Sequence, residues 1–322
     1  MSITEATLEN LNKVAVAGVD TLVGETLLDK LGELHMPSPL AIGYSDDAEP
    51  PMYRGRPLPL TTLSALDLSA IEVLLVLPGL PDSELVSRAE DAGIRLLDCA
   101  DILAQRDDCL LVGADLPGEA GSLSWAIADV VSHNVALALA GVEGIARIDL
   151  SVVLPVSVAG RPGLETLAAE TARMLNGQPP PASSFSQPLA FNVAVDASAA
   201  EIEQNLSRLL TVGNFAPQVN CLASMASAFH AHLCQVRVET DQSVDLPSLR
   251  ERWAGNSLLD YLPGEAPSAV ALADSERIQV GALFADRRNP NAFRFALSGD
   301  YLRHGVVNTC ISLLQFLIKN AS

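Results

Sequence analysis

The chain is short of basic side chains. Only 20 Lys and Arg stand against 39 Asp and Glu, a formal net charge of −19 over 322 residues. A protein that neutralises phosphates does not usually carry so negative a field, because like charges repel. We therefore expect neither nucleic acid nor an anionic membrane surface as a partner.

Long apolar runs and paired cysteines are also missing. The longest apolar candidates, 135–142 and 306–318, are too short or too interrupted for the ~18 residues of a membrane span. Residues 1–13 are acidic and polar, unlike a secretion signal. The five cysteines show no CxxC spacing, which favours reduced thiols and a cytoplasmic protein without a membrane segment.

Apolar residues, by contrast, are abundant at 49% of the chain, which excludes disorder. Without a membrane segment, this excess indicates a sheet covered on both faces or a large subunit interface. At roughly 150 residues per domain, the length predicts two domains.

Strands and helices are expected to alternate in the first half, with strands at 13–18, 39–44, 71–77 and 94–98 and helices at 25–34 and 82–92. Such alternation with short loops predicts a parallel, doubly wound sheet. The second half differs, with helices expected at 124–140, 165–176 and 301–319 and strands at 147–158, 218–228, 232–240 and 278–285.

A glycine loop, Gly18-Val-Asp-Thr-Leu-Val-Gly24, lies between the first predicted strand and helix. A dinucleotide phosphate would meet a helix N-terminus at such a place. Only two of the usual three glycines are present, and the side chain of Thr21 at the middle position would intrude on a pyrophosphate. A tight turn without any ligand is an equally good interpretation.

This loop resembles the opening G-A-T-G-x-V-G of the aspartate-semialdehyde dehydrogenase family. Four later segments resemble further motifs of that family in the same order: 158–165 (VAGRPGLE), 189–193 (LAFNV), 229–232 (FHAH) and 300–305 (DYLRHG). Chance would not preserve both order and spacing, so the chain is identified as a divergent member of this family.

The resemblance implies an α/β protein with two domains. Residues 1–125, completed by 300–322, would form a Rossmann-type doubly wound NAD(P)-binding-like domain. Residues 126–299 would form an α+β catalytic-like and dimerisation domain, with the C-terminal helix returning to the first domain. It also implies a homodimer and an NAD(P) cofactor on Gly18, Thr21, Val23 and Gly24.

The family's reaction reduces an acyl phosphate to an aldehyde through a cysteine thiolate, assisted by a histidine, a glutamine and arginines. The histidine is retained as His232, whereas the other positions fall on Val130 (cysteine), Leu154 (glutamine), Met225 (an arginine) and Ala104 (the phosphate arginine, with Arg106 nearby as a displaced substitute). A shift of a few residues would bring Ser132 or His133 to the cysteine position, but 122–154 contains no thiol. Valine cannot attack a carbonyl. We therefore expect that this reaction is lost and that His232 is a structural hydrogen-bonding residue.

The loop expected to hold the 2′-phosphate of NADP is acidic, with Asp46, Asp47 and Glu49. These carboxylates would repel that phosphate, although one could accept bonds from the ribose diol of NAD. Weak or absent NAD(P) binding is the expectation.

Three competing sites carry less weight. His230, His232 and Cys234 share one face of a predicted strand, but that spacing is stretched for a zinc ion. Cys234 as a relocated nucleophile would need a neighbour that lowers its pKa. Asp129, Ser132 and His133 follow one another too closely on one helix to form a hydrolytic relay.

Two hypotheses about function remain. The first is a dimeric non-catalytic or regulatory homologue, with a heteromer containing an active paralogue as a further variant. The second is an NAD(P)-dependent oxidoreductase acting on an aldehyde or acyl group. We favour the first, because chemistry requires a nucleophile.

Overall fold

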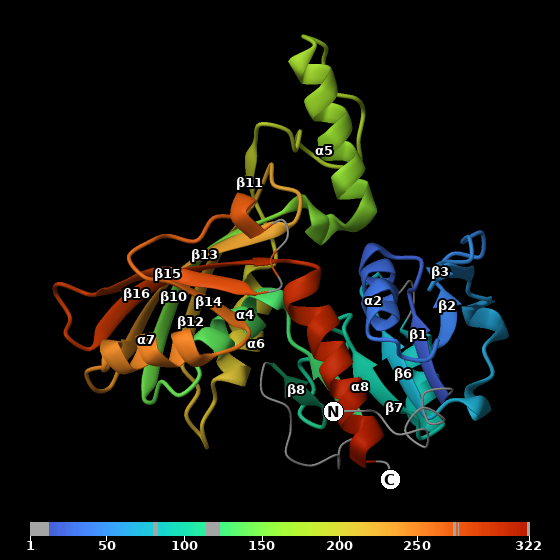
Figure 1. Cartoon of the computed structure of the whole chain (residues 1–322), viewed down its shortest axis with the longest axis horizontal. Helices are drawn as coiled ribbons and strands as arrows, with labels where there is room; N and C mark the ends of the chain where they lie inside the picture. Colours follow the sequence, from blue (N-terminus) through green and yellow to red (C-terminus); the bar gives the residue numbers. More distant parts are fainter. Residues whose placement is uncertain (1–12, 80–82, 114–122, 273–274, 276, 321–322) are drawn as a thin grey trace. The chain divides into compact units, whose positions relative to one another are not determined.

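The computed structural model describes residues 13–79, 83–113, 123–272, 275 and 277–320. The chain divides into a first unit, residues 1–128 with 306–322, and a second unit, residues 129–305 (Figure 1). Each unit contains its own seven-stranded sheet. The sequence predicted domain boundaries at 125/126 and 299/300, whereas the two units meet at 128/129 and 305/306. The sequence-based domain boundaries stay a prediction.

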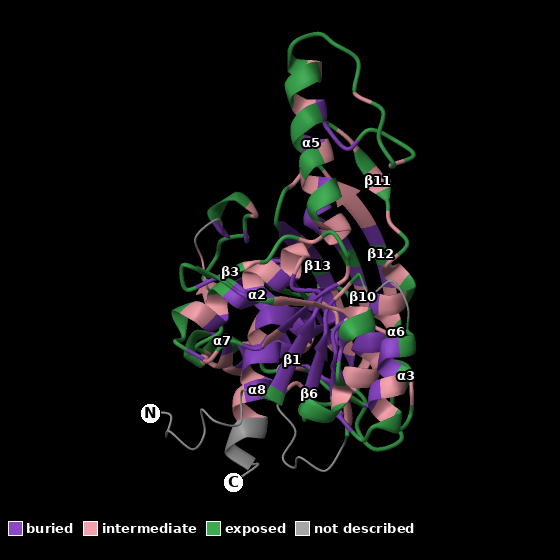
Figure 2. Cartoon of the chain, turned by 90° about the vertical axis from the view of Figure 1, so that its right-hand side faces the viewer, coloured by how far each residue is buried: buried purple, intermediate pink, exposed green. Residues whose placement is uncertain are grey.

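All strand pairs in the sheet of the first unit are parallel, in the order β5-β2-β1-β6-β7-β9-β8. Its elements are β1 (Val14–Ala17), α2 (Leu22–Glu33), β2 (Leu40–Gly43), β5 (Leu60–Thr62), β6 (Val73–Val76), α3 (Glu84–Asp91), β7 (Arg95–Asp98), β8 (Leu110–Val112), β9 (Ser124–Ile127) and α8 (Asn308–Asn320), with a small hairpin of β3 (Met52–Tyr53) and β4 (Arg56–Pro57). The central strands of this sheet are covered on both faces: every residue of β1 and β6 is buried (Figure 2). The Rossmann-type fold is confirmed, and α8 returns to this unit as expected. The expected helix at 82–92 starts at a residue outside the described ranges.

The helix expected at 124–140 is wrong in its first part. Residues Ser124–Ile127 form β9, which pairs with β7, and the helix α4 (Val130–Ala138) begins only after the N-cap Asp129. A segment that is apolar on all sides has no periodicity, so a buried strand and a buried helix look alike in sequence.

The helix expected at 301–319 also begins later. Residues Arg303–Val307 form a wide turn in which Gly305 has φ 155° and ψ −103°, and α8 starts at Asn308. Only glycine adopts such a backbone readily, so Gly305 interrupts the apolar pattern.

The second unit holds a mixed sheet in the order β11-β12-β10-β13-β16-β15-β14. Its strands are β10 (Ile145–Leu154), β11 (Val193–Val195), β12 (Gln218–Ala226), β13 (Ala231–Thr240), β14 (Leu259–Leu262), β15 (Ile278–Ala285) and β16 (Ala292–Asp300), and its helices are α4, α5 (Gly160–Leu175), α6 (Ala199–Leu209) and α7 (Leu246–Gly255). The strand β16, between β13 and β15, was not expected from the sequence. With this sheet the predicted α+β second domain is confirmed.

The central strands of this sheet alternate between buried and more exposed residues. The helices α4 and α6 pack together on the buried side: the Ser132 hydroxyl on α4 donates to the Ile202 carbonyl on α6 at 3.2 Å. On the other face, Leu222 of β12 is 76% exposed, beside ion pairs such as Arg147–Asp149 and Arg237–Glu239. This unit therefore presents one open sheet face.

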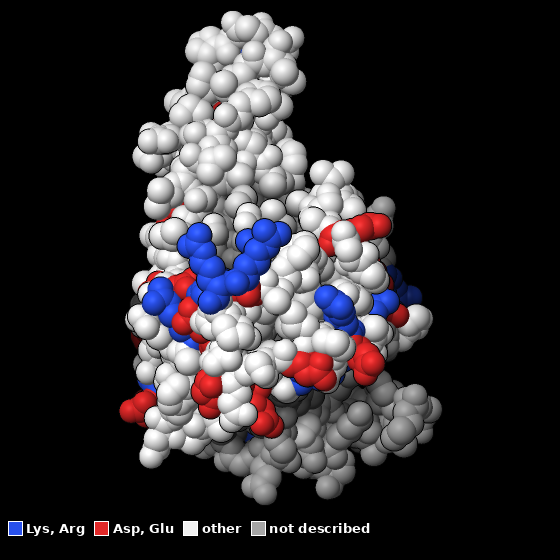
Figure 3. Space-filling model, turned by 90° about the vertical axis from the view of Figure 1, so that its left-hand side faces the viewer, with Lys and Arg blue, Asp and Glu red and all other residues white. Residues whose placement is uncertain are grey.

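Charges of both signs lie side by side on the surface in Figure 3. The first unit likewise has surface ion pairs between neighbouring charges of opposite sign, such as Lys30–Glu33 and Arg106–Glu90. Within the described ranges, every helix is too short or too polar to cross a bilayer.

Candidate functional site

The glycine loop of the first unit is a tight turn closed by its own side chains. Gly18 has φ 93°, and a Cβ on Gly24 would lie 2.2 Å from the Gly18 carbonyl oxygen. Thr21 is the N-cap of α2: its hydroxyl donates to the Gly18 carbonyl at 2.7 Å and accepts from the Gly24 N–H at 3.1 Å. The threonine thus occupies the Gly24 N–H, a backbone donor that a phosphate would use. Val23 lies in the first turn of α2 and is partly buried.

A carboxylate also lies in this loop. Asp20 accepts the backbone N–H groups of Tyr44 and Ser45 at 2.9 and 3.0 Å. A carboxylate beside a pyrophosphate would repel it. The exposed Asp46 and Asp47 follow close by in sequence. The donor set of this loop therefore does not fit a dinucleotide phosphate.

Val130, where the resemblance places the family's nucleophile, is the first residue of α4 and is 1% exposed. A Cβ on Gly305 would lie 2.9 Å from Val130 Cγ2, so the valine packs against the glycine backbone. The start of α4 matches the place where a helix dipole would favour a thiolate. The side chain there is a hydrocarbon.

His232, the histidine that the resemblance identifies as retained, is completely buried at the start of β13. The Asn134 side-chain oxygen lies 3.0 Å from His133 Nδ1, so its amide nitrogen, 3.3 Å from His232 Nε2, donates to that atom. Burial, followed by repulsion from His304, lowers the pKa of His232 from 6.5 to about 3. The imidazole is therefore neutral, and its Nε2 is an acceptor already in use.

His304 is a second buried imidazole near this point. Its Nδ1 accepts from the Asp300 N–H at 2.9 Å, and its Nε2 lies 2.9 Å from the Ser275 carbonyl oxygen, to which it donates. These two bonds place the ring hydrogen on Nε2. A Cβ on Gly299 would lie within 3.5 Å of atoms of Asn134, His232 and His304, so three polar side chains converge on one glycine.

The two other altered positions lie at the same end of the sheet. Leu154 pairs directly with Met225 across β10 and β12, and Val153 pairs with Leu233, the neighbour of His232. Leu154 is buried, and Met225 packs against a buried apolar cluster that includes Val156. Apolar packing thus replaces the polar groups that the resemblance implies.

The cysteines of the second unit offer no substitute nucleophile. Burial raises the pKa of the Cys234 thiol well above its usual value, and burial together with Glu203 raises that of Cys221 to about 12. A thiol that stays protonated is a poor nucleophile. His230 is exposed whereas His232 and Cys234 are buried, and the described ranges hold no group of three His, Cys, Asp or Glu residues that could bind a metal.

The side chains of Asp129, Ser132 and His133 each have separate partners. Asp129 accepts the Ser132 N–H at 2.9 Å and an Asn205 side-chain N–H at 3.2 Å, as an N-cap does. The Ser132 hydroxyl donates to the Ile202 carbonyl instead. None of these bonds joins the Ser132 hydroxyl to the His133 imidazole or to the Asp129 carboxylate.

Arg106, in the first unit, is engaged by two carboxylates. Its guanidinium donates to Glu90 at 2.9 and 3.1 Å and to Asp108 at 2.9 and 2.6 Å. These bonds raise its pKa further. Ala104 beside it is completely buried. The guanidinium fork is thus already used by the chain's own anions.

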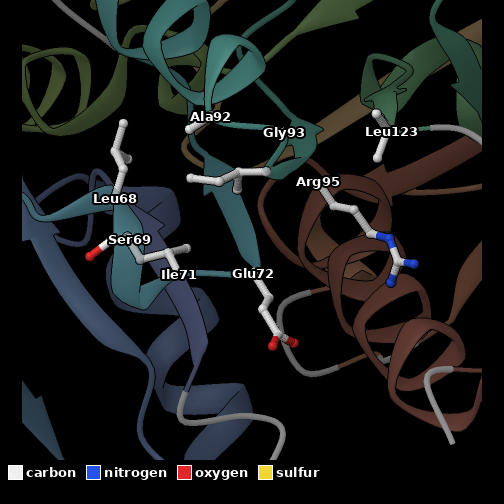
Figure 4. Close-up of a pocket in the computed structure, with 9 residues that line it drawn as sticks. Leu68, Ser69, Ile71, Glu72, Ala92, Gly93, Arg95 and Leu123 are labelled. Carbon is white, nitrogen blue, oxygen red and sulfur yellow. The ribbon is translucent and has the colours of Figure 1, made fainter.

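An open pocket of about 820 Å³ lies elsewhere in the first unit (Figure 4). It is lined by Ile71 and Glu72, which precede β6, by Gly93 and by Arg95 at the start of β7. This is the amino end of the strands, whereas ligands of parallel sheets bind at the carboxyl ends. Glu72 also pairs with Lys13, so we do not assign a ligand to this pocket.

Comparison with known proteins decides the family. A sequence profile for the semialdehyde dehydrogenase dimerisation domain matches residues 136–304, just over half of the chain. The chain belongs to the semialdehyde dehydrogenase family. The resemblance found in the five motifs is confirmed, and the matched region covers most of the second unit.

Relatives that match over nearly their whole length include both USG-1 protein homologues and aspartate-semialdehyde dehydrogenases. A USG-1 protein homolog of Azotobacter vinelandii is 25% identical over 95% of this chain and 97% of its own length. Aspartate-semialdehyde dehydrogenase 2 of Vibrio cholerae is 24% identical over 95% of this chain and 98% of its own length. The crystal structure of aspartate semialdehyde dehydrogenase II from Vibrio cholerae superposes with a TM-score of 0.87 at 22% identity, over 95% and 98% of the two chains.

Four residues that shape these sites were absent from the sequence predictions: Asp20, Tyr44, Asn134 and His304. Two of them had a signal, because Asp20 replaces the threonine of G-A-T-G and His304 replaces the lysine of D-N-L-R-K-G. Asn134 and Tyr44 had none, since their importance depends on neighbours that are distant in sequence.

Proposed function

We propose that this chain is a dimeric non-catalytic or regulatory homologue that has lost the acyl-phosphate/semialdehyde dehydrogenase reaction. Val130 carries the proposal, because a buried valine begins α4 where the resemblance requires a thiolate. The apolar Leu154 and Met225 and the neutral His232 support it. A single loss could be compensated, but joint loss at one end of the sheet removes the means of acyl transfer.

The test is an assay of phosphate-dependent aspartate-semialdehyde oxidation with NAD and with NADP, beside a competent dehydrogenase at equal concentration. We expect no nucleotide reduction above the protein-free rate. A rate comparable to that of the competent enzyme would overturn the proposal. We also expect NAD(P) binding to be weak or absent, since Asp20 and Thr21 oppose a phosphate.

A second candidate is an NAD(P)-dependent oxidoreductase acting on another aldehyde or acyl compound. The retained His232 and the two glycines Gly18 and Gly24 favour it. The hydrogen bond from Asn134 to Nε2 and the lowered pKa weigh against it, because a general base needs a free acceptor with a pKa near the working pH. Saturable turnover of any aldehyde with NAD or NADP would favour this candidate over the first.

A homodimer is the assembly that we propose. The match to a dimerisation domain supports it, as does the open sheet face with Leu222. Sedimentation of the purified chain tests the homodimer, and co-purification from the native host tests the alternative heteromer with an active paralogue. We propose a cytoplasmic location on the ground of the five free cysteines.

A further inference from the structure

We infer that Tyr44 fills, from within the chain, the crevice of the first unit in which a dinucleotide would bind, so that this fold is closed to NAD and NADP. The inference rests on the proposed function and extends the loss from the reacting groups to the cofactor site. It concerns the Tyr44 ring, in addition to the Asp20 charge and the Thr21 side chain that were described above.

The place is defined by the topology of the sheet. In open parallel sheets, ligands bind beyond the carboxyl ends of the strands where the strand order reverses. In the first unit the order reverses between β1 and β6, because β2 lies on one side of β1 and β6 on the other. Gly18 follows β1, Tyr44 follows β2 and Leu77 follows β6. A dinucleotide would therefore have to lie over these three strand ends.

The Tyr44 side chain reaches across all three strand ends. Its hydroxyl donates to the Leu77 carbonyl at 2.6 Å. Between these ends the ring lies against Gly18: a Cβ on that glycine would lie 2.5 Å from Tyr44 Cε2 and 2.8 Å from Cζ. A Cβ on Gly79 would lie 4.0 Å from Tyr44 Cδ2. Burial raises the pKa of the phenol, so the hydroxyl remains a donor.

This contact accounts for a glycine that no ligand requires. In a dinucleotide site, the missing Cβ lets the pyrophosphate approach the backbone. Here the same missing Cβ leaves room for the tyrosine ring. Any larger residue at position 18 would collide with the ring and would also be strained at φ 93°. Gly18 is therefore explained by the turn and by the Tyr44 ring, without a bound dinucleotide.

Asp20 holds the tyrosine in this place. Its two carboxylate oxygens accept the N–H groups of Tyr44 and Ser45 at 2.9 and 3.0 Å. These charge-assisted bonds join the glycine loop to the segment after β2. The Asp20 carboxylate would therefore repel a phosphate, and it also fixes the Tyr44 ring in the place that a dinucleotide would occupy. Both residues must change before a dinucleotide can enter.

The test uses the full chain and titration calorimetry with NAD and NADP. A background of Asp20→Thr with Thr21→Gly restores the family's loop, and into it we place either Tyr44→Ala or its matched control Tyr44→Phe. We expect no saturable binding at millimolar nucleotide for the wild type or the Phe variant. The Ala variant should bind at least about tenfold more tightly than the Phe variant.

Micromolar binding by the wild type would overturn the inference, as would equal affinities of the folded Ala and Phe variants. Hydrogen exchange on the wild type covers the case in which the Ala variant does not fold. Excess NADP should leave the exchange of the Tyr44 and Ser45 amides unchanged, and a change would count against the inference. Binding by the wild type without semialdehyde turnover would overturn only this inference, leaving the proposed function intact.

Discussion

Acidification should destabilise the second unit through His232. The unfolded chain titrates this imidazole at 6.5, whereas burial and His304 lower the pKa in the folded state to about 3. Between these values the unfolded state binds more protons, so the stability is complete above pH 6.5 and falls as the pH drops towards 3. The loss is about 1.4 kcal/mol per pH unit over most of this range, hence about 2 kcal/mol at pH 5 and about 4 kcal/mol at pH 3, where the folded imidazole is half protonated. The value at pH 5 depends little on how low the folded pKa lies.

The measurement compares His232→Gln with the wild type by chemical denaturation at pH 7 and pH 5. A Trp125→Phe background leaves Trp253, which donates to the Ala138 carbonyl at 2.7 Å, as the fluorescent reporter of the second unit. Between the two pH values the wild type should lose about 2 kcal/mol more than His232→Gln. The exposed His230 provides the control, and His230→Gln should behave as the wild type.

Contributions from groups that do not interact with His232 are common to both proteins and cancel in the difference. Equal losses in the wild type and His232→Gln would refute the assignment of a buried, neutral imidazole. A His232 ring signal that titrates near pH 6.5 by NMR would refute it independently. Either result would also reopen His232 as a general base for the alternative function.

Three further predictions concern other parts of the chain. Val130→Cys should leave phosphate-dependent semialdehyde oxidation at background, because Leu154 and Met225 are still apolar; measurable turnover would show that only the thiol is missing. Glu170→Ala should destabilise by about 2–4 kcal/mol in chemical denaturation, since the buried carboxylate accepts the Leu189 and Ala190 N–H groups at 2.6 and 2.9 Å; the exposed Glu165→Ala is its control, and equal stabilities would contradict the expectation. Leu222→Asp should convert the proposed dimer to monomer in sedimentation, while Val270→Asp, also on an exposed residue, should not; an unchanged dimer would exclude this sheet face.

Much of the architecture followed from sequence pattern. The strands β1, β2, β6 and β7 are short apolar runs bounded by turns, and they lie where the pattern predicts. The pattern failed at β9 and β16, although both lie inside their sheets. The segment of β9 is apolar on all sides and resembles the helix that follows, so periodicity could not separate the two.

In the candidate site, too, some features could be predicted from the sequence and others depended on the tertiary structure. Residue types aligned to ordered motifs were sufficient to identify the family. They also predict valine in place of the nucleophile, because such a prediction needs only the residue at a single position. The state of His232 and the role of Tyr44 depended on tertiary structure. Asn134 is 98 residues from His232, and Leu77 is 33 residues from Tyr44. A pKa and a filled crevice are set by what lies within a few ångströms, and only the folded chain brings those neighbours together.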